Sequence, residues 1–388
     1  MTSSFVEPGS RLGVLGGGQL GAMFGNAARR LGYRLAVWDP DPEAPALKLA
    51  ERPICGPFQD PGLLQQFVTE LSVATYEWEN LPHDTVEALG SLLPVRPAPR
   101  ILTLLQNRLH QKRFLAEHGF PLAAFRAISS PKELEATGEL GWPRLCKTVT
   151  SGYDGKGQWK LTSPSQIEPL QRQLRQGSGP WVLEEFLQFE KELSVLVVRG
   201  HDGERRVYPV VENLHEAGIL RVTTVPASID THTAEQAAEL AASIVEALEG
   251  VGVFCVELFL MPDGRLLVNE VAPRPHNSGH YTLDACTVSQ FEQQVRAVCL
   301  LPLGEIRLLS PAVMVNLLSD DLTRIGHGAV LELLRIPGVS LHLYGKRAIR
   351  PRRKMGHVTF LAEKTEAARA SAQGLVRRLQ QSMDQLQH

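Results

Sequence analysis

The first hundred residues alternate between short apolar runs and longer segments of mixed polarity. The apolar runs predict strands at residues 11–15, 34–38, 72–76 and 93–95. Residues 18–31 are rich in small residues and predict a helix that ends at Gly32. A strand, helix, strand order predicts a parallel sheet, and the proline-rich residues 94–99 mark its end.

A second block follows, with a helix that begins near Ile101 and is broken at Gly119 and Pro121. Strands are predicted at 144–149, 181–186, 192–198, 251–260 and 265–271, and helices at 234–248 and 289–300. The last block has predicted strands at 313–317, 340–344 and 357–361 and a terminal helix at 366–386. We therefore expect three domains, at residues 1–100, 101–305 and 306–388.

Composition narrows the class of protein. Of the 388 residues 43% are hydrophobic, and the net charge of -2 comes from interspersed charges, so no nucleic-acid partner is expected. There is no signal-peptide pattern and no run of eighteen apolar residues, which predicts a soluble, cytoplasmic protein without a membrane partner. The five cysteines form no C-x-x-C pair, so we expect buried thiols rather than a zinc site or disulfides.

A glycine-rich turn, Gly16 to Gly21, lies between the first strand and helix and matches G-x-G-x-x-G, with Asp39 at the end of the next strand. This pattern is typical of dinucleotide sites, but tight turns need glycine whatever the ligand is. We expect a phosphate-bearing or other anionic ligand here rather than NAD, with a purely structural turn as the alternative. Gln19 at the helix start would suit a small polar substrate.

A second glycine-rich loop is stronger evidence for phosphate binding. It consists of Gly152, Tyr153, Asp154, Gly155, Lys156, Gly157 and Gln158. Its glycines allow the backbone to approach phosphate oxygens, while Lys156 and Lys147 of the preceding strand supply charge. The loop lacks the G-K-[ST] of a Walker motif, and a flexible hairpin with a solvated lysine is the alternative.

Two glutamates lie on the strands of a predicted hairpin. Glu257 and Glu270 flank the turn at residues 261–264, so the two carboxylates can face each other across neighbouring strands. Like charges side by side repel unless a cation lies between them, and carboxylates with phosphate oxygens suit Mg²⁺. The hairpin therefore predicts a magnesium site, against the alternative of solvated edge residues.

Three further segments carry candidate binding residues. Glu184, Glu185, Phe186 and Leu187 follow a strand and resemble a hinge that reads adenine, with Glu192 placed for ribose hydroxyls. Residues 272–280 form an irregular polar loop directly after Glu270 and are suited to orient a substrate. The late basic cluster around Lys346 and Arg353 could bind a substrate phosphate, although such runs are usually solvated.

Seven motifs in the same order resemble those of the 5-(carboxyamino)imidazole ribonucleotide synthetases, ATP-grasp ligases of purine biosynthesis. They lie at residues 16–21, 152–158, 269–280, 289–292, 302–304, 342–346 and 353–357, and the resemblance spans about residues 10–360. It implies an ATP-grasp fold of mixed α/β and α+β class, with a Rossmann-like N-terminal domain that holds no NAD and a small C-terminal domain, in a homodimer. The implied reaction joins bicarbonate to 5-aminoimidazole ribonucleotide through carboxyphosphate, with ATP converted to ADP and phosphate.

The resemblance also implies roles for individual residues. ATP would be contacted by Arg108, Lys147, Gly152, Tyr153, Asp154, Gly155, Lys156, Gly157, Gln158, Glu184, Glu185, Phe186, Leu187, Glu192, His215, Asn269 and Glu270. The carboxylates of Glu257 and Glu270 would hold Mg²⁺. The implied catalytic residues are Arg274, Lys147, Tyr153 and Glu77, and the implied substrate-binding residues are Gln19, Glu77, His276, Asn277, Ser278, Lys346 and Arg353.

Four positions depart from common patterns. Asn107 stands where an aspartate often precedes the arginine, Ser151 and Arg352 stand where glycine is frequent, and Ala272 stands where other ATP-grasp enzymes place an asparagine metal ligand. Three other functions remain as alternatives: a formylating ATP-grasp sibling, an NAD-dependent dehydrogenase and a non-catalytic nucleotide-binding subunit. The segments at 342–346 and 353–357 argue against the formylating sibling. A dehydrogenase would leave the paired glutamates and the second glycine-rich loop unexplained. A non-catalytic subunit would be expected to have lost Lys147, Glu257, Glu270 or Arg274, and all four are present.

Overall fold

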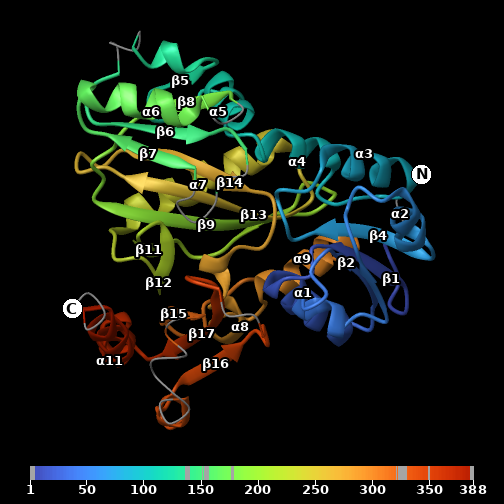
Figure 1. The fold of residues 1–388 in the computed structure, drawn as a ribbon. Coiled ribbons are helices and arrows are strands. Elements are labelled where there is room, and N and C mark those ends of the chain that lie inside the picture. Colours follow the sequence, from blue (N-terminus) through green and yellow to red (C-terminus); the bar gives the residue numbers. More distant parts are fainter. Residues whose placement is uncertain are drawn as a thin grey trace.

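The computed structural model describes residues 5–135, 140–150, 152, 157–175, 179–319, 321, 330–347 and 350–384. Within these ranges the strands form three sheets, which Figure 1 shows as a blue N-terminal part, a green upper layer and a long central sheet. Short 3-10 helices lie in loops of the described residues, at η1 Pro45–Lys48, η2 Pro131–Leu134, η3 Pro164–Gln166 and η4 Asn277–Gly279. No helix among the described residues is both long and apolar enough to cross a bilayer.

The N-terminal sheet has the strand order β3-β2-β1-β4, with all pairs parallel. Its elements are β1 Arg11–Leu15, α1 Gln19–Arg30, β2 Arg34–Asp39, β3 Arg52–Cys55, α2 Pro61–Val68, β4 Leu71–Tyr76 and α3 His83–Leu92. The predicted parallel sheet is confirmed, but β3 was not predicted. The predicted strand at 93–95 is reduced to one bridge between Ala74 and Val95, because the prolines around it cannot donate ladder hydrogen bonds.

A second, antiparallel sheet has the order β5-β8-β6-β7. The elements of this region are α4 Pro99–Leu105, α5 Arg108–Glu117, β5 Phe125–Ile128, β6 Arg144–Thr148, β7 Gln158–Leu161, α6 Ile167–Leu174 and β8 Trp181–Glu185. The single helix predicted from Ile101 is wrong. The first helix, α4, ends at Leu105, and Asn107 caps a second helix, α5. Its Oδ1 accepts hydrogen bonds from the amides of Leu109 and His110, at 3.0 and 3.1 Å. Asparagine thus caps α5 at the position where aspartate is frequent.

The large sheet has the order β14-β13-β9-β11-β12-β15-β17-β16, and β10 pairs with β9. Its strands are β9 Lys191–Arg199, β10 Arg205–Val207, β11 Val211–Glu216, β12 Ile219–Val225, β13 Gly252–Leu260, β14 Leu266–Ala272, β15 Ala312–Leu318, β16 Val339–Leu343 and β17 Lys354–Leu361. The predicted strands are present, whereas the β11–β12 hairpin was not predicted. Since β12 pairs with β15, this sheet continues across residue 305.

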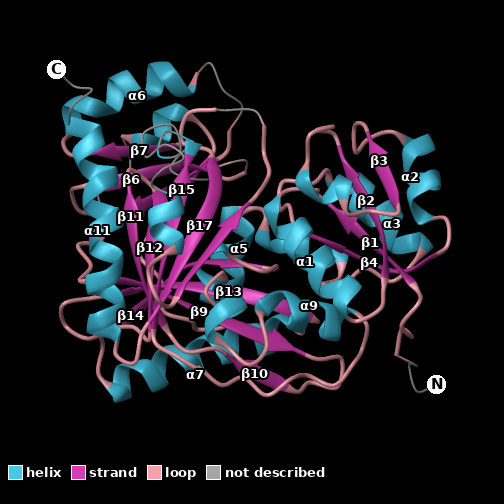
Figure 2. Ribbon diagram, turned by 90° about the horizontal axis from the view of Figure 1, so that it is seen from below, coloured by secondary structure: helices cyan, strands magenta, loops and turns pink. Residues whose placement is uncertain are grey.

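Further helices connect the sheets or cover them in the second half of the described chain, at α7 Thr231–Leu248, α8 Thr282–Ala285, α9 Gln290–Val298 and α11 Thr365–Asp384. Apolar residues of α7 pack on β9 and β13 in the largest core. Phe24 of α1 shares a core with Phe291 and Val295 of α9, which fixes the N-terminal sheet against the middle of the chain (Figure 2). Ala368 and Ala372 of α11 pack on β15 and β17. These packings hold the N-terminal sheet and the last strands of the chain against the middle part.

Candidate active site

The carboxylates of Glu257 and Glu270 meet across the β13–β14 hairpin, where the two residues are register partners. The register shifts directly after this pair, so that Asn269 and Glu270 together oppose Glu257. Such a bulge turns two neighbouring side chains toward one side. The amide Nδ2 of Asn269 consequently donates to Glu257 Oε2 at 3.3 Å. Sequence reasoning predicted the pair of glutamates but not the bulge that brings Asn269 to it.

The charges around this pair fit a divalent cation. Burial and the neighbouring charge of Glu270 raise the pKa of Glu257 to about 7. On the other side, His276 Nε2 lies 3.3 Å from Glu257 Oε1, and burial holds the pKa of His276 well below its usual value. A neutral imidazole adds no positive charge, and the guanidinium of Arg108, 3.6 Å from Glu270 Oε2, offsets only one of the two carboxylates. Their oxygen atoms therefore form the kind of anionic donor set that Mg²⁺ prefers.

Arg108, the first residue of α5, joins the helix to this centre. Its Nη2 donates to the carbonyl of Gly152 at 2.7 Å, and its Nη1 lies 3.6 Å from Glu270 Oε2. Gly157 has a left-handed φ of +70° and its carbonyl accepts from the amide of Thr148 at 2.9 Å; Gln158 begins β7. The predicted loop residues Tyr153, Asp154, Gly155 and Lys156 lie outside the described residues, as does Ser151.

The side chain of Lys147 points from β6 toward Glu184 of β8, with Nζ 2.9 Å from Oε2. A second lysine that sequence reasoning missed, Lys112 of α5, lies 3.3 Å from Oε1 of the same carboxylate. Burial raises the pKa of Glu184, but the charges of Lys147 and Lys112 outweigh it and the pKa lies below its usual value. The position of Lys112 one helical turn after Arg108 was the available signal.

The hinge prediction covers residues around the end of β8. The Glu184 side chain lies between the lysines, so a hinge contact at this residue would have to use its backbone. Glu185 is exposed, and Phe186 and Leu187 are half-buried. Lys160 Nζ lies 3.7 Å from the centroid of the Phe186 ring.

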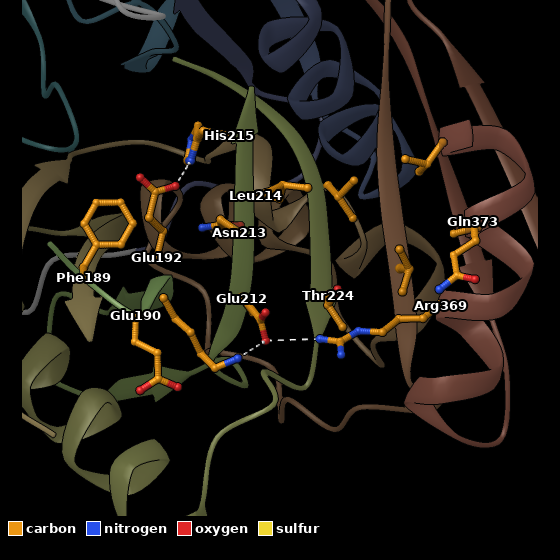
Figure 3. Close-up of a pocket in the computed structure, with 15 residues that line it drawn as sticks. Phe189, Glu190, Glu192, Glu212, Asn213, Leu214, His215, Thr224, Arg369 and Gln373 are labelled. Atoms are coloured by element: carbon orange, nitrogen blue, oxygen red, sulfur yellow. Dashed lines mark hydrogen bonds and ion pairs between the residues drawn. The ribbon is translucent and has the colours of Figure 1, made fainter. Parts of the chain in front are cut away.

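Glu192 and His215 are in direct contact on adjacent strands β9 and β11. They belong to the rim of a pocket of about 440 Å³ (Figure 3). The rest of its lining comes from residues such as Lys191, Glu212 and Arg369, and Glu212 Oε2 lies within 3.3 Å of both cations. His215 follows a register shift in β11, which sequence reasoning did not detect.

The glycine-rich turn before α1 is occupied by carboxylates of the chain itself. The amide of Gly17 donates to Asp39 Oδ2 and that of Gly21 to Glu77 Oε2, both at 2.6 Å, and Gly18 also donates to Glu77. A Cβ on Gly18 would lie 2.7 Å from Glu77 Oε1. These amides are thus already bound by Asp39 and Glu77, since a carboxylate suits the positive end of a helix, and the expected anionic ligand at this turn stays a prediction.

Arg274 follows the β13–β14 hairpin and contacts the end of the N-terminal sheet. Its Nη2 is 2.8 Å from Oε1 of Glu79, and its Nη1 donates to the carbonyl of Pro275. Burial raises the pKa of Glu79, and the charge of Arg274 acts in the opposite direction. Sequence reasoning missed Glu79, although it lies two residues after Glu77 at the carboxyl end of β4, where sites in parallel sheets gather.

The last segment of the chain reaches the first. Lys346 Nζ donates to Gln19 Oε1 at 2.7 Å and to the carbonyl of Lys354 at 3.0 Å. Arg353 Nη2 lies 3.6 Å from Asp41 Oδ2. Burial and the nearby charge of Arg353 lower the pKa of Lys346 to about 8. Arg352, at a position where glycine is frequent, has a left-handed φ of +63°.

The loop after β14 is tied down by hydrogen bonds. His276 Nδ1 and Ser278 Oγ are 2.9 Å apart, and Ser278 bonds in turn to Ser194 of β9 at 2.8 Å. Asn277 is buried, and neither atom of its amide has a hydrogen-bond partner among the described residues. Such an orphaned amide is free to bind a ligand.

Asp284, His342 and His357 place three metal-type ligand atoms within 4.8 Å of one another. The imidazoles of His342 and His357 are stacked, with centroids 4.4 Å apart and an interplanar angle of 11°. A metal ion lies in the plane of each imidazole that binds it, and two stacked rings share no such point. In this conformation the cluster is a packed polar core, with His342 bonded to Asp284 and His357 to Tyr344.

Comparison with protein-family models assigns the three parts of the chain. Residues 10–106 match the ribonucleotide synthetase preATP-grasp domain, residues 113–291 the ATP-grasp domain, and residues 312–371 the phosphoribosylaminoimidazole carboxylase C-terminal domain. The predicted ATP-grasp fold is confirmed.

Curated relatives match nearly the whole chain. The N5-carboxyaminoimidazole ribonucleotide synthase of Bacillus subtilis is 40% identical over 94% of this chain and 94% of the relative. The enzyme of the same name from Brucella melitensis is 40% identical over 94% of this chain and all of the relative.

Solved structures agree with the curated relatives. An ADP complex of an N5-carboxyaminoimidazole ribonucleotide synthetase has a TM-score of 0.91 at 39% identity and covers 96% of this chain and 98% of its own. The Aspergillus clavatus enzyme in complex with ADP and 5-aminoimidazole ribonucleotide has a TM-score of 0.88 at 34% identity, over 96% of this chain and 99% of its own. The chain therefore belongs to the N5-carboxyaminoimidazole ribonucleotide synthase family.

Proposed function

We propose that this chain is an ATP-dependent carbon–nitrogen ligase that carboxylates 5-aminoimidazole ribonucleotide with bicarbonate, in purine biosynthesis. Identity of 40% to synthases of this name over nearly the full chain supports the proposal, as does similarity to a structure that holds both ADP and the ribonucleotide. One observation of the structure carries it: the hydrogen bond between Lys346 and Gln19 joins the last part of the chain to the first, and the ion pair between Arg274 and Glu79 joins the middle part to the first.

On the nucleotide side, Lys147 and Arg108 supply cationic groups for the phosphates, together with the loop at 152–158. The segment at 184–187 covers the end of β8 and is assigned to adenine, while Glu192 and His215 are assigned to the ribose. Glutamates 257 and 270 would hold Mg²⁺, with Asn269 beside them. When bound, the ion neutralises charge on the phosphates during transfer.

Bicarbonate is a poor electrophile, and phosphorylation by ATP to carboxyphosphate gives its carbon a phosphate leaving group. Arg274 lies four residues after Glu270, and its guanidinium can stabilise negative charge on the transferred phosphoryl group or on carboxyphosphate. The amine of the ribonucleotide then attacks this carbon, or the carbon dioxide it releases, and phosphate leaves. Tyr153, His276, Asn277 and Ser278 are assigned to orient these reactants.

The ribonucleotide phosphate is assigned to Lys346 and Arg353, which lie beside Gln19 and Asp41. Glu77 holds the turn that carries Gln19, because its carboxylate accepts from the amides of Gly18 and Gly21. A substrate phosphate near Lys346 would thus be bound by a rigid pair of segments. We further propose that the protein is cytoplasmic and that it forms a homodimer. Light scattering of the purified protein would test the homodimer.

The proposal is tested by release of ADP with Mg²⁺ and ATP. Bicarbonate and 5-aminoimidazole ribonucleotide are added separately and together, and formate with glycinamide ribonucleotide serves as the control. Turnover that requires the imidazole ribonucleotide and bicarbonate together is the expected result. Turnover with the control pair would identify the formylating sibling, and no turnover with either pair would contradict a ligase function.

A further inference from the structure

Three charged side chains form a buried cluster between α5 and the small antiparallel sheet. Lys112, Lys147 and Glu184, here called the buried triad, are 4%, 8% and 4% exposed. Each lysine approaches a different oxygen of the carboxylate, Lys147 at 2.9 Å from Oε2 and Lys112 at 3.3 Å from Oε1. The family resemblance and the proposed function use Lys147 and the region of Glu184, but they leave Lys112 without a role.

Charge counting shows why the second lysine matters. Two ammonium groups facing one carboxylate leave one net positive charge in a place with little water. A buried charge without a counter-charge is costly, so such a site favours an anion. Arg108 acts on Lys112 as another positive charge and therefore does not offset the excess. The excess charge of the buried triad is thus available to a phosphate.

We infer that Lys112 is a positioning residue for nucleotide binding: it serves as the standing counter-ion of Glu184 and so leaves the charge of Lys147 for the phosphates. Glu184 and Lys147 are already 2.9 Å apart. Without Lys112 they would be left as a neutral pair, and Lys147 would have to give up the only counter-ion of Glu184 within the triad to bind a phosphate. The inference rests on the proposed function only in placing the nucleotide phosphates at Lys147.

This role predicts an order of affinities that follows the charge of the buried triad. The probe is ADP with Mg²⁺, titrated into the full-length protein by calorimetry. Lys112→Met reduces the net charge to zero, and we expect ADP affinity to fall on the order of tenfold, the scale of one charge-assisted hydrogen bond. In a Glu184→Gln background, which leaves no carboxylate to neutralise, we expect the same Lys112→Met change to lower ADP affinity by less than about threefold relative to Glu184→Gln.

Two further variants complete the order. Glu184→Gln alone leaves two positive charges and is the reference for the double variant, so that any effect of Glu184 itself on adenine binding cancels from the comparison. Lys112→Arg keeps the charge and should behave as wild type, while Lys132→Met, at an exposed lysine of η2, is the matched control. Thermal unfolding of each variant checks the fold. If Lys112→Met does not fold, comparison of the double variant with Glu184→Gln decides the question.

A loss of about tenfold from Lys112→Met in the Glu184→Gln background as well would overturn the inference, since it would show that Lys112 only supports the packing of α5. Wild-type affinity in Lys112→Met would overturn it as well. Neither outcome bears on the carboxylation reaction, because calorimetry with ADP requires no turnover. Conversely, a wild-type protein that binds ADP but fails to use 5-aminoimidazole ribonucleotide would contradict the proposed function and leave the test of Lys112 intact.

Discussion

Glu257 and Glu270 lie opposite each other on antiparallel strands, and the bulge beside them directs Asn269 onto Glu257 at 3.3 Å. Two carboxylates in such a position repel each other, and burial of Glu257 together with this repulsion raises its pKa to about 7. The arrangement is unfavourable for the protein alone, and we expect a divalent cation between the carboxylates to offset the repulsion. Two predictions depend on this relationship.

Replacing one carboxylate should stop phosphoryl transfer without loss of the fold. Glu270→Gln removes a charge but keeps the shape of the side chain, and we expect ADP release to fall at least about 100-fold. Far-ultraviolet circular dichroism and thermal unfolding should be close to wild type. Activity near the wild-type level would contradict the magnesium assignment of Glu270.

The stabilising effect of Mg²⁺ should depend on pH. The pKa of Glu257 is raised in the folded protein, so without metal its contribution to stability is lost as pH rises from about 4.5 to about 7. Mg²⁺ binds the ionised carboxylate and stabilises the fold by mass action. We expect Mg²⁺ to raise the melting temperature more at pH 8 than at pH 5.5. Glu257→Gln is the control, and an equal Mg²⁺ effect at both pH values in wild type would argue against this site.

Affinity for the ribonucleotide should weaken at alkaline pH. Burial lowers the pKa of Lys346 to about 8, so the ammonium group that we assign to the substrate phosphate loses its charge above this pH. We expect the KM for the ribonucleotide to rise through about pH 8, while the KM for ATP changes little. Lys346→Arg should shift the rise to higher pH, because a guanidinium stays protonated.

Removal of either cation that we assign to the ribonucleotide phosphate should weaken binding of the ribonucleotide but not of ATP. Lys346→Ala and Arg353→Ala should each raise the KM for the ribonucleotide on the order of tenfold or more, with ATP affinity little changed. Lys364→Ala, at an exposed lysine, is the matched control. An equal loss of ATP binding in the two variants would show that the cluster serves the nucleotide instead.

The ion pair between Arg274 and Glu79 should affect catalysis more than binding. Arg274→Lys keeps the charge but not the fork of donors, and we expect kcat to fall about 100-fold with KM values little changed. Glu79→Gln keeps a hydrogen-bond acceptor 2.8 Å from Arg274 but not the charge, so its effect on kcat should be several-fold smaller. The two changes together should not be additive. Additive effects on kcat would show that Glu79 does not act through Arg274.

The sequence indicated most regular elements because their patterns are local. Apolar runs marked the strands that carry Lys147, Glu257 and Glu270, and the small-residue segment marked α1. Short polar strands escaped detection, among them β11 with His215, since their burial comes from neighbours far along the chain. Asn107 was read as the interior of one helix, although its side chain caps a new one. Here the local preference for capping prevailed over the apolar periodicity.

By itself the sequence determined the motifs, the paired glutamates and the ATP-grasp fold that the motifs imply, because spacing within a hairpin or loop fixes which residues are neighbours. Only the tertiary structure decided that Lys346 meets Gln19, that Glu79 holds Arg274, that Glu77 fills the glycine-rich turn and that Lys112 shares Glu184 with Lys147. Each of these contacts joins separate elements whose packing no local pattern encodes. The side chains that charge and position the site therefore become visible only once the sheets and helices are packed.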